Sequence, residues 1–378
     1  MYRRKDGRWV ASVRWPTGER KYRYARTQQK ALAELRELCG VRDVGQPVPN
    51  DELTVGGWAA EWMTRYVSKL AYGTRRRYEQ VRRDYIAPET GKPRLRRVKL
   101  RMLNVSTVAR WADALLVDGV SPAMVAYSLM VLSSMVQAAM REELIARNPV
   151  KLVKPPKYEK REANPLSDDE AKVLLGAESM REHRLFALLV LAITSALREA
   201  EMSAVQWGAI DKAKGRLWVR QQLQRETGRG LVLVPTKTER SKAPVALTRV
   251  FLRVLDEHRA RLIEERMRLG ARWRGSDNPV ADDAYVFVST VGTPLDGKQV
   301  WKVWAGMLKD AGIEHRRLHD SRHTTSTLLQ AMGVPMDDIK EVLRHSRAVM
   351  TEDYSHAGFI RQQAAAARLD ELLGEVLA

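Results

Sequence analysis

Two proline-containing stretches constrain the fold of this chain most, because they divide it into segments that must fold separately. The first, residues 44–50, reads Val-Gly-Gln-Pro-Val-Pro-Asn, and the second, residues 151–160, contains Pro155-Pro156 and four lysines. Stretches of this composition remain extended and exposed, so both are predicted to be linkers. At roughly 100–200 residues per domain, the 378 residues are expected to form two or three domains.

Basic residues are concentrated ahead of the second linker. The formal net charge is +7 for residues 1–48, +9 for residues 49–160 and only +3 for residues 161–378. This distribution predicts that the N-terminal part binds a polyanion and that the C-terminal part has a more selective function. A basic surface that serves only solubility is the alternative.

The composition excludes several classes of protein. An apolar fraction of 44% excludes a disordered or collagen-like chain. No apolar run reaches the roughly 18 residues of a membrane span, and the first residues, Met-Tyr-Arg-Arg-Lys, do not resemble a secretory signal. A cytoplasmic protein with no membrane partner is therefore expected. The single cysteine, Cys39, excludes an internal disulfide and a cysteine-based zinc site.

Residues 1–48 are predicted to form a small α+β domain. Residues 8–15 alternate as a strand does, with Trp9, Val13 and Trp15 on one face and Arg14 on the other. A turn at Thr17-Gly18 leads to a basic strand over 19–25, and Thr27 is predicted to cap a helix over about 28–39. The expected DNA contacts are Arg14, Lys21 and Arg23. The alternative is a small basic domain that binds no ligand.

Residues 52–150 are predicted to form an all-helical domain. Thr54 is expected to begin one helix, Thr74 to cap another over 75–86, and Ser121-Pro122 to begin a third that runs to about Ala146. The second of these helices has a core face and a cationic face. Its cationic face supplies further expected DNA contacts, namely Arg75, Arg76, Arg77, Arg82 and Arg83.

Residues 163–378, after a linker at 151–162, are predicted to be mostly helical with a small antiparallel sheet. Ser167 and Glu170 form a capping box, which explains the acidic residues there without a metal. Short strands are expected within residues 208–221 and 230–237. The last helix, Ala364 to Leu377, has an apolar stripe, which consists of Ala365, Leu369, Leu372, Leu373 and Val376.

Five of the seven histidines lie within 42 residues of this C-terminal part, and a tyrosine, Tyr354, lies among them. The order of the surrounding motifs resembles the tyrosine recombinase (phage integrase) family. The motifs are Thr194-Ser-Ala-Leu-Arg198-Glu-Ala-Glu201, Thr236-Lys237-Thr238, His319-Asp-Ser-Arg322-His323-Thr324, Leu343-Arg-His345-Ser346 and Tyr354-Ser-His356.

The resemblance implies a multidomain, mainly α-helical protein with the tyrosine recombinase catalytic fold. Residues 1–48 would be an arm-type DNA-binding domain, residues 52–150 a helical core-binding (SAM-like) domain, and residues 163–378 the catalytic domain. The resemblance also implies Tyr354 as nucleophile and Glu201 as support for the first arginine. The implied phosphate-activating set is Arg198, Lys237, His319, Arg322 and His345.

These residue types suit the chemistry of strand exchange without a metal, ATP or another cofactor. Two arginines offer paired donors to the oxygens of a phosphate whose negative charge grows in the transition state. His319 is expected to accept the phenol proton and His345 to bind a phosphate oxygen. Lys237 is the expected acid for the leaving 5′ oxygen. A 3′-phosphotyrosyl bond at Tyr354 would retain the bond energy for religation.

Each of these residues also has a structural interpretation. Tyr354 could be a partly buried core tyrosine and His345 a core histidine. Arg198 could pair with Glu201 at i,i+3 and still bind phosphate. Lys242 lies five residues after Lys237 and is the alternative lysine.

Two positions depart from the family pattern, in which glycine is usual. At the first, Ala196, we expect a helical backbone that alanine tolerates, because a positive φ would strain it. At the second, Arg344, we expect a side chain that points to DNA or solvent. Neither departure removes a reacting group.

The sequence therefore predicts an integrase that joins a phage or mobile element to a bacterial chromosome. The expected partner is double-stranded DNA at core crossover sites and arm sites, bound by a homotetramer whose subunits are linked through residues 363–378. A DNA-bending host factor, an excision factor and a location at the nucleoid in the host cytoplasm are further expectations. The alternatives are a resolvase or invertase of the same family, a non-catalytic DNA-binding protein that keeps the fold, and a type IB topoisomerase.

Overall fold

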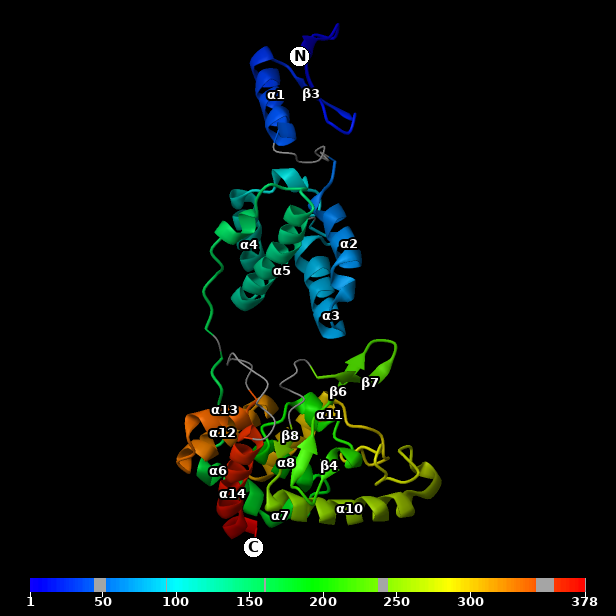
Figure 1. Cartoon of the computed structure of the whole chain (residues 1–378), viewed down its shortest axis with the longest axis vertical. Coiled ribbons are helices and arrows are strands. Elements are labelled where there is room, and N and C mark those ends of the chain that lie inside the picture. The colour runs from blue at the N-terminus through cyan, green and yellow to red at the C-terminus, as the bar shows by residue number, and fades with distance from the viewer. Residues whose placement is uncertain (44–51, 93, 160, 237–243, 345–356, 378) are drawn as a thin grey trace. The chain divides into compact units, whose positions relative to one another are not determined.

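The computed structural model describes residues 1–43, 52–92, 94–159, 161–236, 244–344 and 357–377. The chain forms two compact units, residues 1–160 and 161–378 (Figure 1). The predicted boundary between the two N-terminal domains lies at residues 44–51, outside the described residues.

The first unit begins with an antiparallel sheet that packs against one helix. Its elements are β1 (Tyr2–Arg3), β2 (Trp9–Arg14), β3 (Arg20–Ala25) and α1 (Gln28–Asp43). Val13 and Trp15 are buried against Leu38 of α1, whereas Arg14 is exposed. The predicted alternation is thereby confirmed at these positions. Thr27 caps α1, as predicted, by accepting a hydrogen bond from the backbone of Lys30 at 3.3 Å.

The rest of the described first unit is helical, as predicted. Its α-helices are α2 (Val55–Arg65), α3 (Tyr72–Val81), α4 (Val105–Val117) and α5 (Pro122–Arg141). A π-helical turn, Arg82–Ile86, continues α3, and short 3₁₀ helices lie at Val67–Lys69, Leu100–Met102 and Pro149–Leu152.

Two of the three helix starts predicted for residues 52–150 are confirmed. Thr54 and Ser121 cap α2 and α5 through their side-chain oxygens. The prediction for Thr74 is wrong, because α3 begins at Tyr72, three residues before the predicted first residue, and its N-cap is Ala71, with φ −55° and ψ 145°. The predicted end of α5 near Ala146 is also too late. The helix stops at Arg141, and Glu143 then adopts a positive φ of 57°.

The helix α5 has the length and the mean hydropathy, 1.5, of a membrane span. Half of its most apolar window is buried within its own unit, however. Val125, Leu132 and Met135 are fully buried there among the residues of α2 and α4. This burial is typical of the core helix of a folded domain.

The second unit is mostly helical with two small antiparallel sheets. One sheet has the order β4-β5-β8 and the other is the hairpin β6-β7, which extends from the body of the unit in Figure 1. The strands are β4 (Ile210–Asp211), β5 (Arg216–Trp218), β6 (Gln221–Glu226), β7 (Gly230–Pro235) and β8 (Pro244–Ala246).

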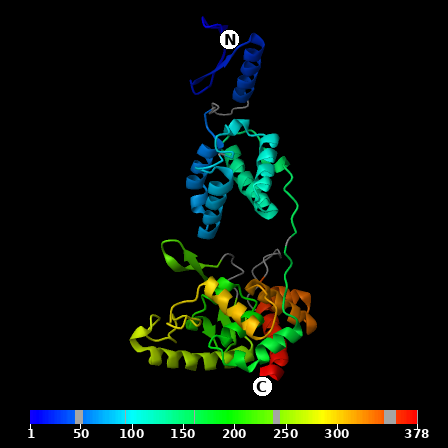
Figure 2. The ribbon, with the colours of Figure 1, turned by 180° about the vertical axis from the view of Figure 1, so that it is seen from behind.

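The helices of this unit surround one apolar core. They are α6 (Asp168–Gly176), α7 (Glu178–Arg181), α8 (Phe186–Thr194), α9 (Glu199–Met202), α10 (Arg249–Leu269), α11 (Gly297–Asp310), α12 (Ser321–Ala331), α13 (Met336–Val342) and α14 (Ala357–Leu377). All residues of α8 are buried, so this helix is the centre of the unit. The predicted capping box at Ser167 and Glu170 begins α6. Figure 2 shows α12, α13 and α14 together on one side of the unit.

The apolar stripe of α14 is buried on its own unit. Ala365, Leu369 and Leu373 belong to the main core, with at most 2% of their surface exposed. Asp370 also accepts hydrogen bonds from the backbone of Arg249 and Val250 at 2.8 and 2.9 Å, which holds the start of α10. The expectation that a neighbouring subunit covers this stripe is therefore wrong for these residues, because α6, α10 and α13 already pack against the helix.

Leu369→Ala should consequently destabilise the second unit. We expect a loss of about 2–5 kcal/mol in its free energy of unfolding, because a fully buried leucine leaves a cavity. Urea denaturation, monitored through hydrogen exchange of the α8 backbone, measures this loss in the free energy of unfolding. The matched control is Ile360→Ala on the same helix, where 57% of the side chain is exposed and a change of less than about 0.5 kcal/mol is expected. Equal effects of the two variants would contradict the packing described above.

Candidate active site

The site is built on the turn that follows the buried helix α8. Ala196 adopts a left-handed backbone with φ of 50°, and Arg198 then precedes the short helix α9. The expectation of a helical backbone at Ala196 is wrong. Helix α8 has already ended at Thr194, and α9 begins only at Glu199. Alanine therefore occupies a conformation that favours glycine.

Glu201 of α9 lies beneath Arg198 and is almost completely buried, with 2% of its side chain exposed. Its Oε1 accepts a hydrogen bond from Nη1 of Arg198 at 2.8 Å, and its Oε2 accepts one from the Arg198 backbone at 3.1 Å. Burial raises the pKa of Glu201, but the charge of Arg344 and the hydrogen bonds from Arg198 outweigh it, so the net pKa is lowered. The predicted i,i+3 pair is thus present, and Glu201 is ionised at neutral pH.

Arg344 follows α13 and also binds Glu201. Its Nη2 donates to Oε2 of Glu201 at 2.6 Å, and only 1% of its side chain is exposed. The expectation that this side chain points to DNA or solvent is wrong, because the side chain is buried against Glu201. The backbone of Arg344 is left-handed, with φ of 49°. Both departures from the family's glycines therefore lie at positive φ.

Arg322 enters the site from the first turn of α12. Its Nη1 donates to the backbone carbonyl of Ala196 at 2.6 Å, and Thr325, one turn later, donates to the carbonyl of Ile193 at 2.7 Å. These two bonds fix α12 against the end of α8. The Nη2 of Arg322 is buried and has no hydrogen-bond partner among the described residues. Burial, followed by the charges of Arg198 and Arg344, lowers the pKa of Arg322 to about 10, so it remains charged at neutral pH.

His319 lies in the 3₁₀ turn, Leu318–Asp320, that leads into α12. Its ring lies edge-on to that of His323, with the centroids 6.0 Å apart. Partial desolvation lowers the pKa of His319, and the charges of His323, Arg322 and Arg317 add to this, while Asp320 opposes it. His319 is therefore neutral at pH 7 and able to accept a proton.

This setting predicts the pH dependence of any step in which His319 accepts a proton. Because the folded pKa lies below the ordinary 6.5, the rate should stay level above that value and fall as the pH drops through the lowered pKa. His323→Asn removes a positive neighbour, so the acid limb of the pH–rate profile should move to higher pH. His323 is exposed, so folding should be unaffected. An unmoved acid limb would exclude His319 as the titrating group.

The structure thus brings together Arg198, Glu201 and Arg322 of the predicted set, with His319 near them. Lys237, His345 and Tyr354 lie outside the described residues, as does the alternative lysine, Lys242. Arg344 is the residue whose place in this cluster the sequence interpretation missed. The sequence feature that could have revealed this position is the arginine itself, which stands where glycine is usual in the family.

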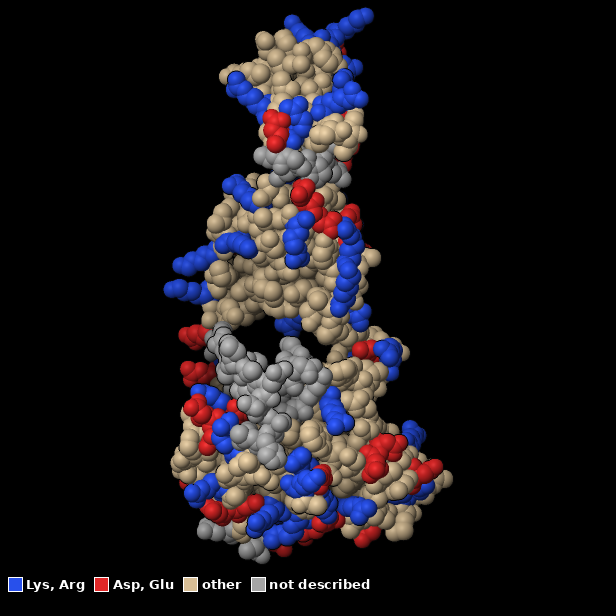
Figure 3. Space-filling view, viewed as in Figure 1, with Lys and Arg blue, Asp and Glu red and all other residues tan. Residues whose placement is uncertain are grey.

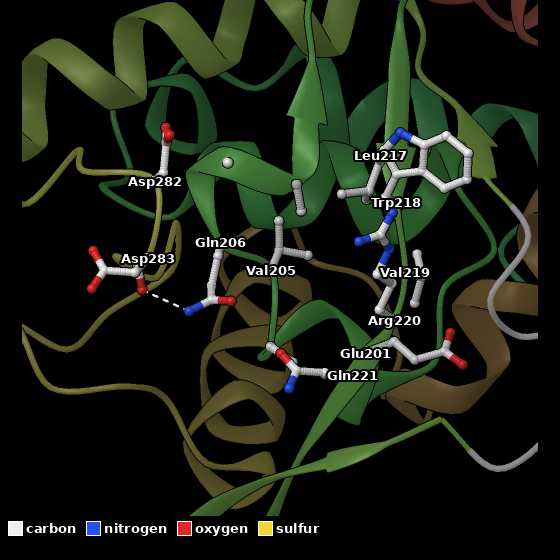
Figure 4. Close-up of a pocket in the computed structure, with 13 residues that line it drawn as sticks. Glu201, Val205, Gln206, Leu217, Trp218, Val219, Arg220, Gln221, Asp282 and Asp283 are labelled. Atoms are coloured by element: carbon white, nitrogen blue, oxygen red, sulfur yellow. Dashed lines mark hydrogen bonds between the residues drawn. The ribbon is translucent and has the colours of Figure 1, made fainter.

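A cavity of about 450 Å³ lies beside the cluster (Figure 4). Of the residues that form the cluster, only Glu201 lines it. Its other walls include Trp218 and Arg220, whose guanidinium lies 5.5 Å from the indole ring centroid, and Gln206, which donates to the carbonyl of Asp283 at 2.6 Å. The arginines that are predicted to bind phosphate do not line this cavity, so we do not assign it to them.

The basic side chains of the first unit differ in exposure. Arg14, Arg76, Arg77 and Arg83 are exposed, and of these Arg83 pairs with Asp84 at 2.7 Å. Figure 3 shows such side chains in blue, with acidic ones more frequent on the second unit. Arg23 lies on the sheet face that packs against α1 and pairs with Glu34 at 3.3 Å, with 12% of its side chain exposed.

The remaining predicted DNA contacts are partly buried. Arg82 pairs with Glu79 at 2.6 Å and keeps only 15% of its side chain exposed. Lys21 and Arg75 are half-buried. Arg23 and Arg82 are therefore less exposed than Arg14 and Arg76, and each already has an acidic partner.

The described residues include no group of three or more His, Cys, Asp or Glu side chains that could hold a metal ion.

Known proteins share both the sequence and the fold of this chain. Residues 164–360, more than half of the chain, match the model of the phage integrase family. A XerC-like tyrosine recombinase from Caldanaerobacter subterraneus is 28% identical over 355 residues, which cover 89% of this chain and 88% of that protein. An integrase from Streptomyces ambofaciens is 28% identical over 367 residues, which cover 92% of this chain and 89% of that one.

Solved structures with the same fold include two integrases. The Tn1549 transposon integrase, in complex with a circular intermediate DNA, has a TM-score of 0.60 and 19% identity over 84% of this chain and 99% of that one. The lambda integrase tetramer bound to a Holliday junction has a TM-score of 0.53 and 18% identity over 92% of each chain. This likeness confirms the predicted multidomain, mainly helical fold.

Proposed function

Because this chain belongs to the phage integrase family of tyrosine recombinases, we propose that it integrates and excises a phage genome or another mobile element. It is a site-specific recombinase, an enzyme that breaks and rejoins DNA strands. The residues that perform each step, the DNA sites and the assembly are part of the proposal.

The arginine cluster carries the proposal. Arg198 and Arg344 both donate hydrogen bonds to Glu201, and the charges of these two arginines act on the nearby Arg322, so positive charge is concentrated at this place. Concentrated positive charge of this kind favours a negatively charged ligand. The Nη2 of Arg322 is also a buried donor without a partner among the described residues, which is rare unless a ligand satisfies it. A phosphate group in DNA offers both the charge and the acceptors.

In the proposed reaction, the Oη of Tyr354 attacks the scissile phosphorus. A phosphorus–Oη bond forms while the bond from phosphorus to the 5′ oxygen breaks. The phenol proton passes to His319, and Lys237 gives a proton to the departing 5′ oxygen. Arg198, Arg322 and His345 bind the nonbridging oxygens as their negative charge grows. The 5′ hydroxyl of another strand reverses the step, so neither ATP nor a metal enters the proposed sequence.

We further propose that subunits act as a homotetramer on two duplexes. The tetrameric state of the lambda integrase on a Holliday junction supports this. The exposed arginines of α3 would contact the core crossover site, and the outer sheet face with Arg14 would contact an arm site. Because two DNA-binding regions are tethered in one chain, binding at one site raises the effective concentration of the other region at a distant site. A DNA-bending host factor, an excision factor and a place at the bacterial nucleoid complete the proposal.

A suicide substrate tests this function. DNA that is nicked close to the cleavage point loses a short fragment after attack, so the protein remains covalently attached. We expect the full chain to form this adduct on its attachment site without added metal. A binding protein that only keeps the fold would form none. A type IB topoisomerase would instead relax plasmids that lack any particular sequence.

A further inference from the structure

We propose that Asp320 and Thr324 are positioning residues for strand cleavage. They hold residues 162–166, here called the joining segment, against the turn that carries His319. The joining segment follows the linker stretch 151–160, which connects it to the first unit. In this way, DNA that is bound by the first unit helps to place His319 at the scissile phosphate. This inference rests on the proposed function, because it concerns the same cleavage step.

Asp320 makes the central contact with the joining segment. Its side chain is 2% exposed, and its carboxylate accepts a hydrogen bond from the backbone of Asn164. Both carboxylate oxygens also accept hydrogen bonds from Arg317, at 2.9 and 3.0 Å. Arg317 in turn donates to the carbonyl of Glu162 at 3.2 Å. Because Asp320 follows His319 directly in the chain, a shift of the joining segment moves the turn that carries this histidine.

Thr324 holds the end of the joining segment on α12. Its hydroxyl oxygen accepts a hydrogen bond from the backbone of Leu166 at 2.9 Å, and both residues are completely buried. The same hydroxyl donates to the carbonyl of Asp320 at 3.2 Å. A buried backbone N–H group that loses its acceptor is costly, so this contact keeps the joining segment in place. One side chain thus links the joining segment to the turn.

The joining segment is suited to transmit a displacement. Residues 161–166 form neither a helix nor a strand. The ring of Pro165 fixes its own φ and restricts the preceding residue, Asn164, to an extended backbone. A movement of the linker stretch therefore reaches the turn with little loss. Positions at the reacting atoms matter, because a displacement of about 1 Å can cost about 100-fold in rate.

Thr324→Val tests the inference, because valine has nearly the same shape but cannot accept the hydrogen bond from Leu166. The measurement is the single-turnover rate of adduct formation by the full chain on a nicked substrate. Protein is in saturating excess, so a change in DNA affinity does not enter the rate. We expect a loss of about tenfold, with binding to intact DNA unchanged.

Two further variants serve as controls. Thr324→Ser keeps the hydroxyl and should recover most of the rate, and an equal loss in this variant would contradict the role of the hydrogen bond. Thr327→Val lies on the same helix and removes a hydroxyl that donates to the carbonyl of His323 within that helix at 3.1 Å. This variant should leave the rate unchanged.

A longer linker separates positioning from a purely structural role. Insertion of Gly-Ser-Gly-Ser between Lys157 and Tyr158, which are both exposed, leaves the joining segment unaltered but loosens its connection to the first unit. We expect the insertion to slow adduct formation about tenfold in the wild-type chain. In Thr324→Val it should slow the reaction less than about twofold, because two changes in one connection are not additive. Equal losses in both chains, or no loss in the wild-type chain, would overturn the inference.

A failure of the inference can be distinguished from a failure of the proposed function. If the wild-type chain forms the adduct and Thr324→Val matches its rate, the inference fails and the proposed function stands. If the wild-type chain forms no adduct, the proposed function fails, and the inference fails with it.

Discussion

The Tyr354→Phe protein should form no covalent adduct with the nicked substrate, a loss of more than about 10⁴-fold in the cleavage rate. Only the phenol oxygen becomes bonded to phosphorus in the proposed reaction, and phenylalanine lacks that oxygen while keeping the ring. Binding to intact attachment-site DNA should therefore be unchanged. Denaturing gel electrophoresis of labelled DNA detects the adduct directly.

A matched control comes from the same unit. Tyr285 is a partly buried tyrosine whose pKa is raised by burial, and Tyr285→Phe should form the adduct at the wild-type rate. If Tyr354→Phe still became attached to DNA, another nucleophile would perform the reaction and the assignment of Tyr354 would be wrong.

Glu201→Gln should cause a large loss of stability in the second unit. Glutamine keeps the shape of the side chain but removes the negative charge that accepts hydrogen bonds from Arg198 and Arg344. Breaking a buried ion pair on one side costs about 3–5 kcal/mol. Urea denaturation with hydrogen exchange of α8 measures the free energy of unfolding of this unit. Cleavage should also slow, because Arg198 loses its orienting partner.

The pH dependence of this effect has a definite sign. The folded pKa of Glu201 is below its ordinary value of 4.5, so its contribution is fully present above pH 4.5 and is lost as the pH falls through the lowered value. The difference between wild type and Glu201→Gln should shrink accordingly in acid.

Glu226→Gln is the matched control for this stability effect. Glu226 is also buried, but it pairs with Arg229, whose side chain is 71% exposed, so a loss of about 1 kcal/mol or less is expected. Equal losses in the two variants would show that the arginine cluster has no special dependence on Glu201.

Sequence patterns predicted the elements of this protein where one local interaction decides them. Thr54, Ser121 and Ser167 cap helices as predicted, because a side-chain oxygen near a backbone donor acts within a few residues. Thr74 does not cap a helix, because α3 already begins at Tyr72, after Ala71, whose side chain forms no capping hydrogen bond.

The interaction partners of charged residues were less predictable. The outward position of Arg14 follows from strand alternation. The pairing of Arg23 with Glu34 does not, because it requires α1 to pack on that face of the sheet. Likewise, the stripe of α14 was recognisable from its spacing, but only the packing of α6, α10 and α13 against it decided that its own unit covers it.

The sequence by itself determined the family, because the order of the motifs is a property of the chain, and the match to the phage integrase family confirms it. Only the tertiary structure decided the backbone at Ala196 and Arg344 and the burial of Arg344 against Glu201. The physical reason is distance along the chain. Arg344 and Glu201 are 143 residues apart, so their contact depends on how α8, α12 and α13 pack, which no local pattern specifies.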